Sequence, residues 1–401
     1  MRAYQRSHPW LTFEAALQDV PTPVWMLLGE VRSKCEHIAG VPMKPEVASR
    51  LLQVFLAKGV LGTTAIEGNT LTQEQVEALV AGQKPDVPSS KAYQVQEVQN
   101  VLEALNSVVL PELKEGRLSA LLTSERVEKF NALVLKNLQL EEGVVPGKTR
   151  TYSVGVLRYR GAPAEDCEYL LDQLCAWLSG PVFDASANPA ELQVPIAILK
   201  AILAHLYLAW IHPFGDGNGR TARLVEVQIL ATAGIPHVAC HVLSNHYNQT
   251  RAEYYRQLER ASASGGNVIP FVEYALRGLV DGLAEQLKLV RVQQLDVAWR
   301  EHVYDKLRHV RHEAGRRIRE LVLELSNRAA PVAKKDMPNL SPTLAVAYSK
   351  KTEKTLSRDL NSLEQLDLVA REPDGYRARK EVILAFLPLR NRSQDVPAQK
   401  P

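Results

Sequence analysis

Apolar residues recur every three or four positions over most of this 401-residue sequence, and that spacing is the period of an amphipathic helix. The sequence therefore predicts a mainly α-helical protein. Thr72 is the expected N-cap of one helix, which follows another that begins at Pro45. Further helices are expected at about 92–109, 123–137, 164–178, 195–210, 219–233, 248–262 and 269–290. Because 46% of the residues are hydrophobic, a chain of this length can form more than one core.

Only two segments indicate β-structure. Residues 149–160, TRTYSVGVLRYR, are rich in β-branched and aromatic side chains around a central glycine, which predicts a short hairpin. Residues 368–379 predict a second hairpin around a Pro-Asp-Gly turn. This hairpin follows a charged helical stretch at 293–327, a short helix opened by Ser341-Pro342, and a helix at 351–365. The order of these elements is that of a winged helix-turn-helix domain.

The C-terminal quarter of the chain is basic. Residues 300–401 contain 21 Lys and Arg against 14 Asp and Glu, a net charge of +7, whereas the whole chain carries only +3. Basic side chains occur on the second short helix and on the expected wing: Lys350, Lys351, Lys354, Arg358, Arg371, Arg377 and Arg379. This pattern suits contacts with DNA phosphates. A role in protein recognition or packing is left open beside it, since +7 over this length is modest.

Other features favour a cytoplasmic protein with no membrane partner. The four cysteines, Cys35, Cys167, Cys175 and Cys240, form no CxxC pair, which is typical of reduced thiols. The first residues are charged and contain no apolar core of a signal peptide. Lys200 and His205 interrupt the most apolar stretch, 194–211, so a buried helix is the better interpretation.

The most informative stretch is His212-Pro-Phe-Gly-Asp-Gly-Asn-Gly-Arg-Thr-Ala-Arg223, between two expected helices. Its alternating glycines allow backbone N–H groups to approach a ligand, and the following helix N-terminus favours an anion. Asp216 suits Mg²⁺ bridging to phosphate oxygens. Arg220 and Arg223 can bind further phosphates, and His212 can accept a proton from an attacking hydroxyl. The spacing predicts a nucleotide-phosphate site with a metal and a general base.

This stretch resembles the signature of the Fic/Doc family, HxFx(D/E)GNGRxxR, at every defined position. The resemblance implies a helical core and transfer of AMP from ATP to a Tyr, Thr or Ser hydroxyl of a target protein. It implies that His212 is the base and that Asp216 holds Mg²⁺. Gly217, Asn218 and Gly219 would then form the anion hole, while Arg220 and Arg223 would bind phosphates. Phe214 resembles the residue that anchors the turn in the core.

A second motif, Thr63-Thr-Ala-Ile-Glu67-Gly68, lies far upstream. It resembles the family's inhibitory motif, (S/T)xxxE(G/N), in which the glutamate pairs with the second motif arginine, here Arg223. The resemblance implies autoinhibition, because a carboxylate on Arg223 would occupy the position of the γ-phosphate. In some members the same glutamate assists removal of AMP, so a de-AMPylase is retained as an alternative.

Two further segments resemble parts of the same family. The hairpin at 151–160, led by Gly147 and Arg150, resembles the flap that docks the target segment by strand pairing. Tyr247, Tyr254 and Tyr255 resemble residues beside the adenine pocket, although aromatics at this spacing more often belong to a core.

The sequence thus predicts a Fic-type helical core with a small β-hairpin flap and a C-terminal winged helix-turn-helix domain. The expected divisions are an N-terminal region with the inhibitory helix, 1–110, a catalytic core, 111–290, a connecting helix, 291–330, and the winged-helix domain, 331–401. The predicted activity is that of an autoinhibited protein adenylyltransferase. Self-AMPylation and a homodimer stay open, as does a DNA-binding regulator whose Fic domain only binds nucleotide.

Overall fold

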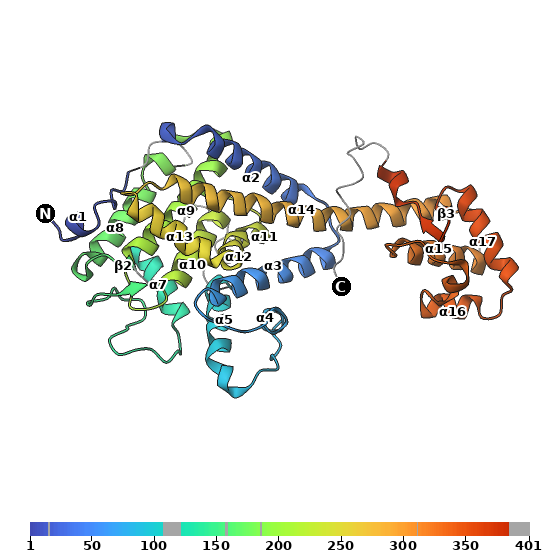
Figure 1. The fold of residues 1–401 in the computed structure, drawn as a ribbon, viewed down its shortest axis with the longest axis horizontal. Coiled ribbons are helices and arrows are strands. Elements are labelled where there is room, and N and C mark those ends of the chain that lie inside the picture. The colour runs from blue at the N-terminus through green and yellow to red at the C-terminus, as the bar shows by residue number, and fades with distance from the viewer. Residues whose placement is uncertain (15–16, 107–121, 157–158, 185–186, 311, 385–401) are drawn as a thin grey trace. The chain divides into compact units, whose positions relative to one another are not determined.

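The computed structural model describes residues 1–14, 17–106, 122–156, 159–184, 187–310 and 312–384 (Figure 1). It confirms a mainly helical protein, and its chain divides into two compact units, 1–288 and 289–401. The first unit contains both the predicted N-terminal region and the predicted catalytic core, which share one hydrophobic core. Its principal helices are α2 (Thr22–Gly40), α3 (Pro45–Ala65), α4 (Gln73–Val80), α5 (Ala92–Ala104), α7 (Ser124–Val134), α8 (Cys167–Leu178), α9 (Ala190–Ile211), α10 (Asn218–Thr232), α12 (Val242–Gln249), α13 (Arg251–Ala263) and α14 (Ile269–Lys306).

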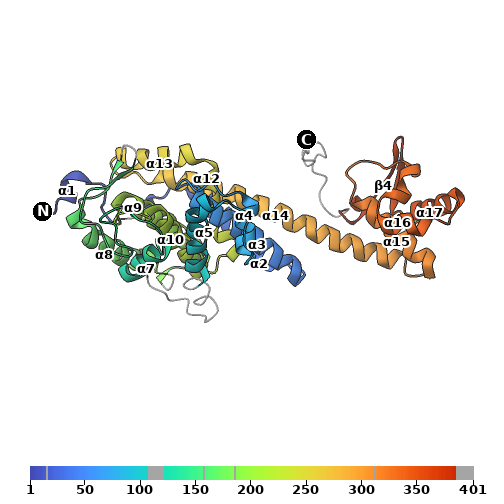
Figure 2. The ribbon, with the colours of Figure 1, turned by 90° about the horizontal axis from the view of Figure 1, so that it is seen from below.

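Helices α9 and α10 form the centre of the first unit and lie side by side in both views (Figures 1 and 2). By length and composition alone, α9 is apolar enough to cross a membrane. However, 78% of its apolar 18-residue stretch is buried inside the protein. A helix that is apolar all round and buried is typical of the centre of a large core.

The predicted start of α9 at Pro195 was wrong, since the helix begins at Ala190 and Pro195 lies inside it. A proline has no N–H to donate to the carbonyl four residues earlier. That carbonyl, of Glu191, instead accepts a hydrogen bond from Nη1 of Arg32 on α2, at 2.9 Å. The side chain of a neighbouring helix thus satisfies the group that the proline leaves unpaired.

Helix α3 packs closely against α12, and its glycine at position 62 allows this approach. A Cβ atom at Gly62 would lie 2.7 Å from the carbonyl oxygen of Ser244. The next helix, α4, begins as predicted after Thr72, which forms a capping box with Gln75. The turn between α3 and α4 contains Glu67 and Gly68, and Gly68 takes a positive φ of 100°. Packing on α12 therefore fixes where this turn is placed.

The predicted hairpin at 151–160 is present as β1 (Gly155–Val156) and β2 (Tyr159–Arg160), which pair antiparallel. Its two connecting residues lie outside the described part of the chain, as do the last three residues of the predicted helix 92–109.

The second unit has its own core and contains α15 (His312–Ser326), α16 (Pro342–Tyr348), α17 (Glu353–Gln365), β3 (Val369–Glu372) and β4 (Gly375–Ala378). These elements follow the order predicted for a winged helix. Ser341 caps α16 as expected, accepting a hydrogen bond from the backbone N–H of Leu344. The predicted division of the long charged segment was wrong. α14 runs on to Lys306, and the chain turns before α15, where Gly315 allows the carbonyl of Val310 to approach closely.

Candidate active site

The turn between α9 and α10 is built from the predicted motif. His212 ends α9 in the left-handed conformation, with φ 51° and ψ 57°, and Gly217 precedes α10 with φ 76°. The buried amide of Asn218 closes the turn, since its oxygen accepts from the N–H of Phe214 and its nitrogen donates to the Phe214 carbonyl, both at 2.9 Å. Phe214 is buried, as predicted. The Asn218 side chain is thus occupied, and only its backbone N–H is available to an anion.

Two buried side chains outside the motif, Arg150 and Asn131, hold this turn by hydrogen bonds to its backbone carbonyls. Arg150 donates from Nε to the carbonyl of His212 at 2.8 Å, and its Nη1 donates to the Tyr152 carbonyl at 2.7 Å. Asn131 on α7 donates to the carbonyl of Asp216 at 2.9 Å. From the sequence, Arg150 is predicted only as part of the flap and Asn131 is not predicted at all, because a polar residue on a helix carries no sign of its distant partner.

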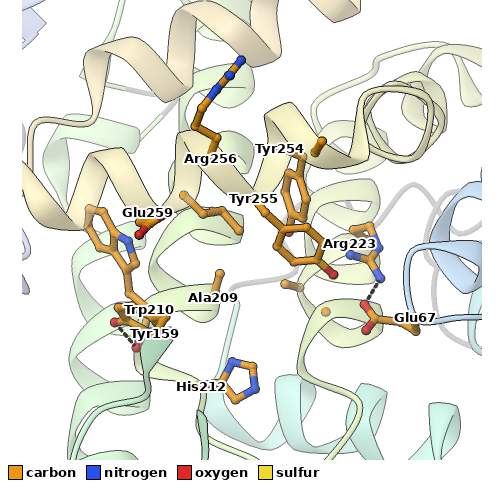
Figure 3. Close-up of a pocket in the computed structure, with 14 residues that line it drawn as sticks. Glu67, Tyr159, Ala209, Trp210, His212, Arg223, Tyr254, Tyr255, Arg256 and Glu259 are labelled. Carbon is orange, nitrogen blue, oxygen red and sulfur yellow. Dashed lines mark hydrogen bonds and ion pairs between the residues drawn. The ribbon is translucent and has the colours of Figure 1, made fainter. Parts of the chain in front are cut away.

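A cavity of about 550 Å³ opens beside the turn (Figure 3). The residues that line it come from the motif helices, the hairpin, α13 and the turn after α3: Glu67, Tyr159, Ala209, Trp210, His212, Gly219, Ala222, Arg223, Ala252, Tyr254, Tyr255, Arg256, Leu258 and Glu259. In the close-up, the ring of His212 lies on one side, Tyr254 and Tyr255 come from the opposite helix, and Glu67 meets Arg223 at one end. The predicted base and the second motif arginine therefore face one cavity.

The environment of His212 favours its neutral form. Its pKa is lowered to about 4, mainly by burial and in smaller part by the nearby Arg150 guanidinium, while a hydrogen bond to the backbone of Ala209 acts in the opposite direction. A neutral imidazole with one nitrogen held by a carbonyl can accept a proton at the other. His212 is thus suited to act as a base at neutral pH.

We expect the imidazole of His212 in the ligand-free protein to titrate near pH 4, well below the ordinary value of about 6.5. Because its pKa is lowered by folding, its contribution to stability is complete above about pH 6.5 and is lost as the pH falls towards 4. NMR titration of the histidine side-chain signals, assigned by their loss in His212→Ala, checks this. A midpoint at or above 6.5 would contradict the burial.

Arg223 is buried, and its Nε and Nη2 atoms make three hydrogen bonds in the described structure. It is 1% exposed, and its Nη2 donates to Oε1 of Glu67 at 2.5 Å. Its Nε donates to the hydroxyl of Thr63 and its Nη2 to the Thr63 carbonyl, each at 2.9 Å. Burial alone would raise the pKa of Glu67, but the Arg223 charge and hydrogen bond outweigh it, so the pKa is lowered and the carboxylate is charged. The two predicted motifs, 156 positions apart, therefore meet as an ion pair.

The Glu67 carboxylate also covers the first turn of α10. A Cβ atom added at Gly219 would collide with Oε1 of Glu67 and would lie 3.1 Å from the nitrogens of the Arg223 guanidinium. The first N–H groups of a helix have no partner within it and favour an anion. Glu67 thus lies at the position where the sequence predicts a bound phosphate.

Arg220 points away from Glu67 towards α5. Its Nη1 donates to Oε1 of Glu97 at 2.7 Å, and its Nη2 to Oδ1 of Asp216 at 3.2 Å. Glu97 in turn accepts a hydrogen bond from Nδ2 of Asn69 at 3.0 Å. Asn69 lies two residues after Glu67. Glu97 is buried and was not predicted as a site residue. Its charge on the inner face of an expected amphipathic helix is the sequence feature that could have indicated a partner there.

The three tyrosines predicted beside adenine are not equivalent. Tyr254 and Tyr255 line the cavity. Tyr247 does not line it and is fully buried, with its hydroxyl donating to Oε1 of Glu226 at 3.0 Å. Tyr247 stacks on Tyr254 with ring centroids 4.9 Å apart, so it supports the cavity wall from behind. The placement of Tyr247 on the ligand side does not agree with the structure, because periodicity alone cannot distinguish a wall from its support.

Tyr247→Phe is expected to lower the free energy of unfolding by about 1–3 kcal/mol, since it leaves the buried Glu226 carboxylate without its donor. Tyr255→Phe makes the same chemical change at the cavity surface and is expected to have a much smaller effect. Thermal unfolding of the two variants checks the difference. Equal stabilities would show that the Tyr247 hydroxyl does not support Glu226.

Comparisons with known proteins agree with the motif. Residues 121–230 match the Fic/DOC family. The chain is 30% identical over 251 residues to Protein adenylyltransferase Fic of Nematostella vectensis, covering 63% of this chain and 53% of that protein. It is 32% identical over 222 residues to Protein adenylyltransferase fic-1 of Caenorhabditis elegans, covering 54% and 38%. The chain thus spans about half the length, or less, of these relatives.

Solved structures show the same fold. A crystal structure of a Fic family protein from Desulfovibrio desulfuricans G20 superposes with a TM-score of 0.55 and 20% identity, covering 90% of this chain and 96% of that one. The match to the signature, the family comparison and the superposition agree. This chain carries a Fic/DOC family domain and has the helical fold of Fic proteins.

Proposed function

We propose that this protein transfers AMP from ATP to a hydroxyl group of a target protein, and that Glu67 holds it in an inhibited state. The observation that carries the proposal is the cavity in which His212, Gly219 and Arg223 face one another. Its volume of about 550 Å³ is within the range of small-ligand sites. The names of the curated relatives, protein adenylyltransferases, support the same reaction.

In the proposed reaction, the oxygen of the target hydroxyl forms a bond to the α-phosphorus of ATP. His212 takes the hydroxyl proton, and the bond to pyrophosphate breaks. The N–H groups at the start of α10 stabilise the charge on the transferring group, and Arg223 binds the terminal phosphate. Arg150 and Asn131 act by holding the backbone of the turn, so that these groups keep their positions.

Asp216 is the residue that would hold Mg²⁺. Its side chain is 44% exposed, and the contacts described for it fall on Oδ1, from the N–H of Gly217 and from Arg220. A single carboxylate suits Mg²⁺ when phosphate oxygens and water supply the other ligands. When bound, the ion would offset charge on the phosphates.

The inhibition follows from competition for Arg223. A γ-phosphate and the Glu67 carboxylate carry like charges and need the same guanidinium. Glu67 lies on the turn after α3, and its neighbour Asn69 is tied through Glu97 to Arg220. Release therefore requires movement of a turn that several contacts stabilise, and the inhibited state is expected to predominate in the free protein.

Incubation with ATP labelled at the α-phosphate tests the proposal. Label is expected on proteins of a cell lysate or on this protein itself, and transfer should be stronger in Glu67→Gly. Labelling that is equally strong in His212→Ala would refute the assignment. Release of AMP from a modified lysate, with no transfer, would favour the reverse reaction at the same site.

A further inference from the structure

The second unit carries a polar stripe along one face of α17. Lys354, Arg358, Asn361 and Gln365 are all exposed, and they follow at steps of four, three and four residues. At 100° per residue, this spacing places them within an arc of about 60°. The buried residues of the same helix, Leu356, Asp359, Leu360 and Leu363, lie on the opposite side. The stripe contains no acidic residue and no apolar one.

The stripe is free of internal partners in the part of the unit that the structure describes. None of its four side chains forms an ion pair or hydrogen bond there. Two basic residues of the hairpin differ. Arg377 pairs with Glu372 and Glu381, and Arg379 pairs with Asp367. The expectation that these two wing arginines contact phosphates is therefore replaced by one centred on α17.

Helix α17 is held rigidly from behind. Its buried Asp359 accepts from Nε and Nη2 of Arg317 on α15, at 2.8 and 3.1 Å. The same carboxylate accepts from the hydroxyl of Tyr348 on α16, at 2.8 Å. One side chain thus joins three helices, and α16 and α17 are separated by a turn of only 349–352. A turn of this length is typical of the helix-turn-helix motif.

We propose that α17 enters the major groove of duplex DNA and reads base edges with this stripe. Arg and Lys pair with guanine edges, and Asn and Gln with adenine edges, so the stripe holds the residue types that such reading uses. Exposed Lys350, Lys351 and Arg371 stand beside it as phosphate contacts. The major groove of B-form DNA admits a helix, whereas that of A-form RNA is too narrow.

The composition of the stripe also argues against a protein partner. The centres of protein interfaces are enriched in aromatic residues and depleted in lysine. The stripe has no aromatic residue and includes a lysine, and the net charge of +7 over residues 300–401 complements a polyanion. This inference concerns the second unit alone, so it stands whether or not the first unit transfers AMP.

Fluorescence anisotropy with the full chain and a random-sequence duplex oligonucleotide tests binding at several salt concentrations. The wild-type chain is expected to bind, with affinity that falls steeply as salt rises. Lys354→Ala and Arg358→Ala should each lower the affinity at 0.1 M salt about five- to ten-fold, and Lys351→Ala, which removes a phosphate contact, should reduce the salt slope by about one. Lys84→Ala removes an exposed charge from the other unit and should change neither quantity.

Selection of preferred sequences from the random pool tests base reading. Asn361→Ala and Gln365→Ala are expected to change the selected sequence with little effect on the salt slope, because they remove no charge. All these side chains are exposed, and circular dichroism confirms that the variants are folded. The proposal is overturned if the wild-type chain does not bind duplex DNA, if Lys84→Ala weakens binding as much as Arg358→Ala, or if duplex RNA binds equally well.

Discussion

Glu67→Gly is expected to raise the rate of AMP transfer by about 10- to 100-fold. The pair that it removes joins a charged carboxylate to a buried guanidinium at 2.5 Å, and a hydrogen bond between charged groups contributes about 1.5–3 kcal/mol. The change also clears the space above Gly219, where a helix N-terminus can accept a phosphate. The backbone turn should tolerate glycine, since Gly68 beside it already adopts a positive φ.

Two further variants separate the effect of the Glu67 charge from the effect of a glycine substitution as such. Glu67→Gln keeps a hydrogen-bond acceptor without the negative charge and should give an intermediate rate. Glu142→Gly makes the same substitution at an exposed turn position of the same unit and should leave the rate unchanged. Initial rates with ATP labelled at the α-phosphate measure all three. A rate for Glu67→Gly equal to that of the wild type would show that the ion pair does not restrain the site.

His212→Ala in the Glu67→Gly background is expected to lower transfer by about 10²- to 10⁴-fold, the usual contribution of a general base. Binding of ATP should change little, because Arg223 and the N–H groups of α10 are untouched. Calorimetric titration with ATP measures binding separately from transfer. The assignment of His212 fails if transfer continues at the rate of the background variant.

The effect of His212→Ala on the backbone of the turn requires a control variant. Its φ of 51° is left-handed, and a non-glycine residue there is strained. Asparagine tolerates this conformation better than alanine and cannot serve as the base. His212→Asn should therefore lose transfer to the same extent while keeping the turn intact. Recovery of transfer in His212→Asn alone would indicate that His212 matters for the shape of the turn.

Much of the fold could be predicted from sequence, because helix periodicity and capping are local. Thr72 and Ser341 begin their helices as expected, since each cap depends on a residue three positions away. The helix boundaries that failed depend on distant partners. α9 extends before Pro195 only because Arg32 of another helix satisfies the freed carbonyl. The end of α14 at Lys306 was also not predicted, because no proline marks it in the sequence.

The sequence by itself determined the chemistry of the candidate site. Glycines, a histidine, an aspartate and two arginines within twelve residues specify a turn that can bind phosphates, because these properties belong to the residues and their spacing. Only the tertiary structure decided which groups are free to act. It places Glu97 on Arg220 and Tyr247 behind the cavity wall, and it shows the ion pair of Glu67 and Arg223 that the inhibitory motif predicts. It also pairs Arg377 and Arg379 of the second hairpin and leaves the stripe on α17 unpaired among the described residues. Such pairings join residues far apart in the chain, and they follow from the packing of whole helices, which no local pattern encodes.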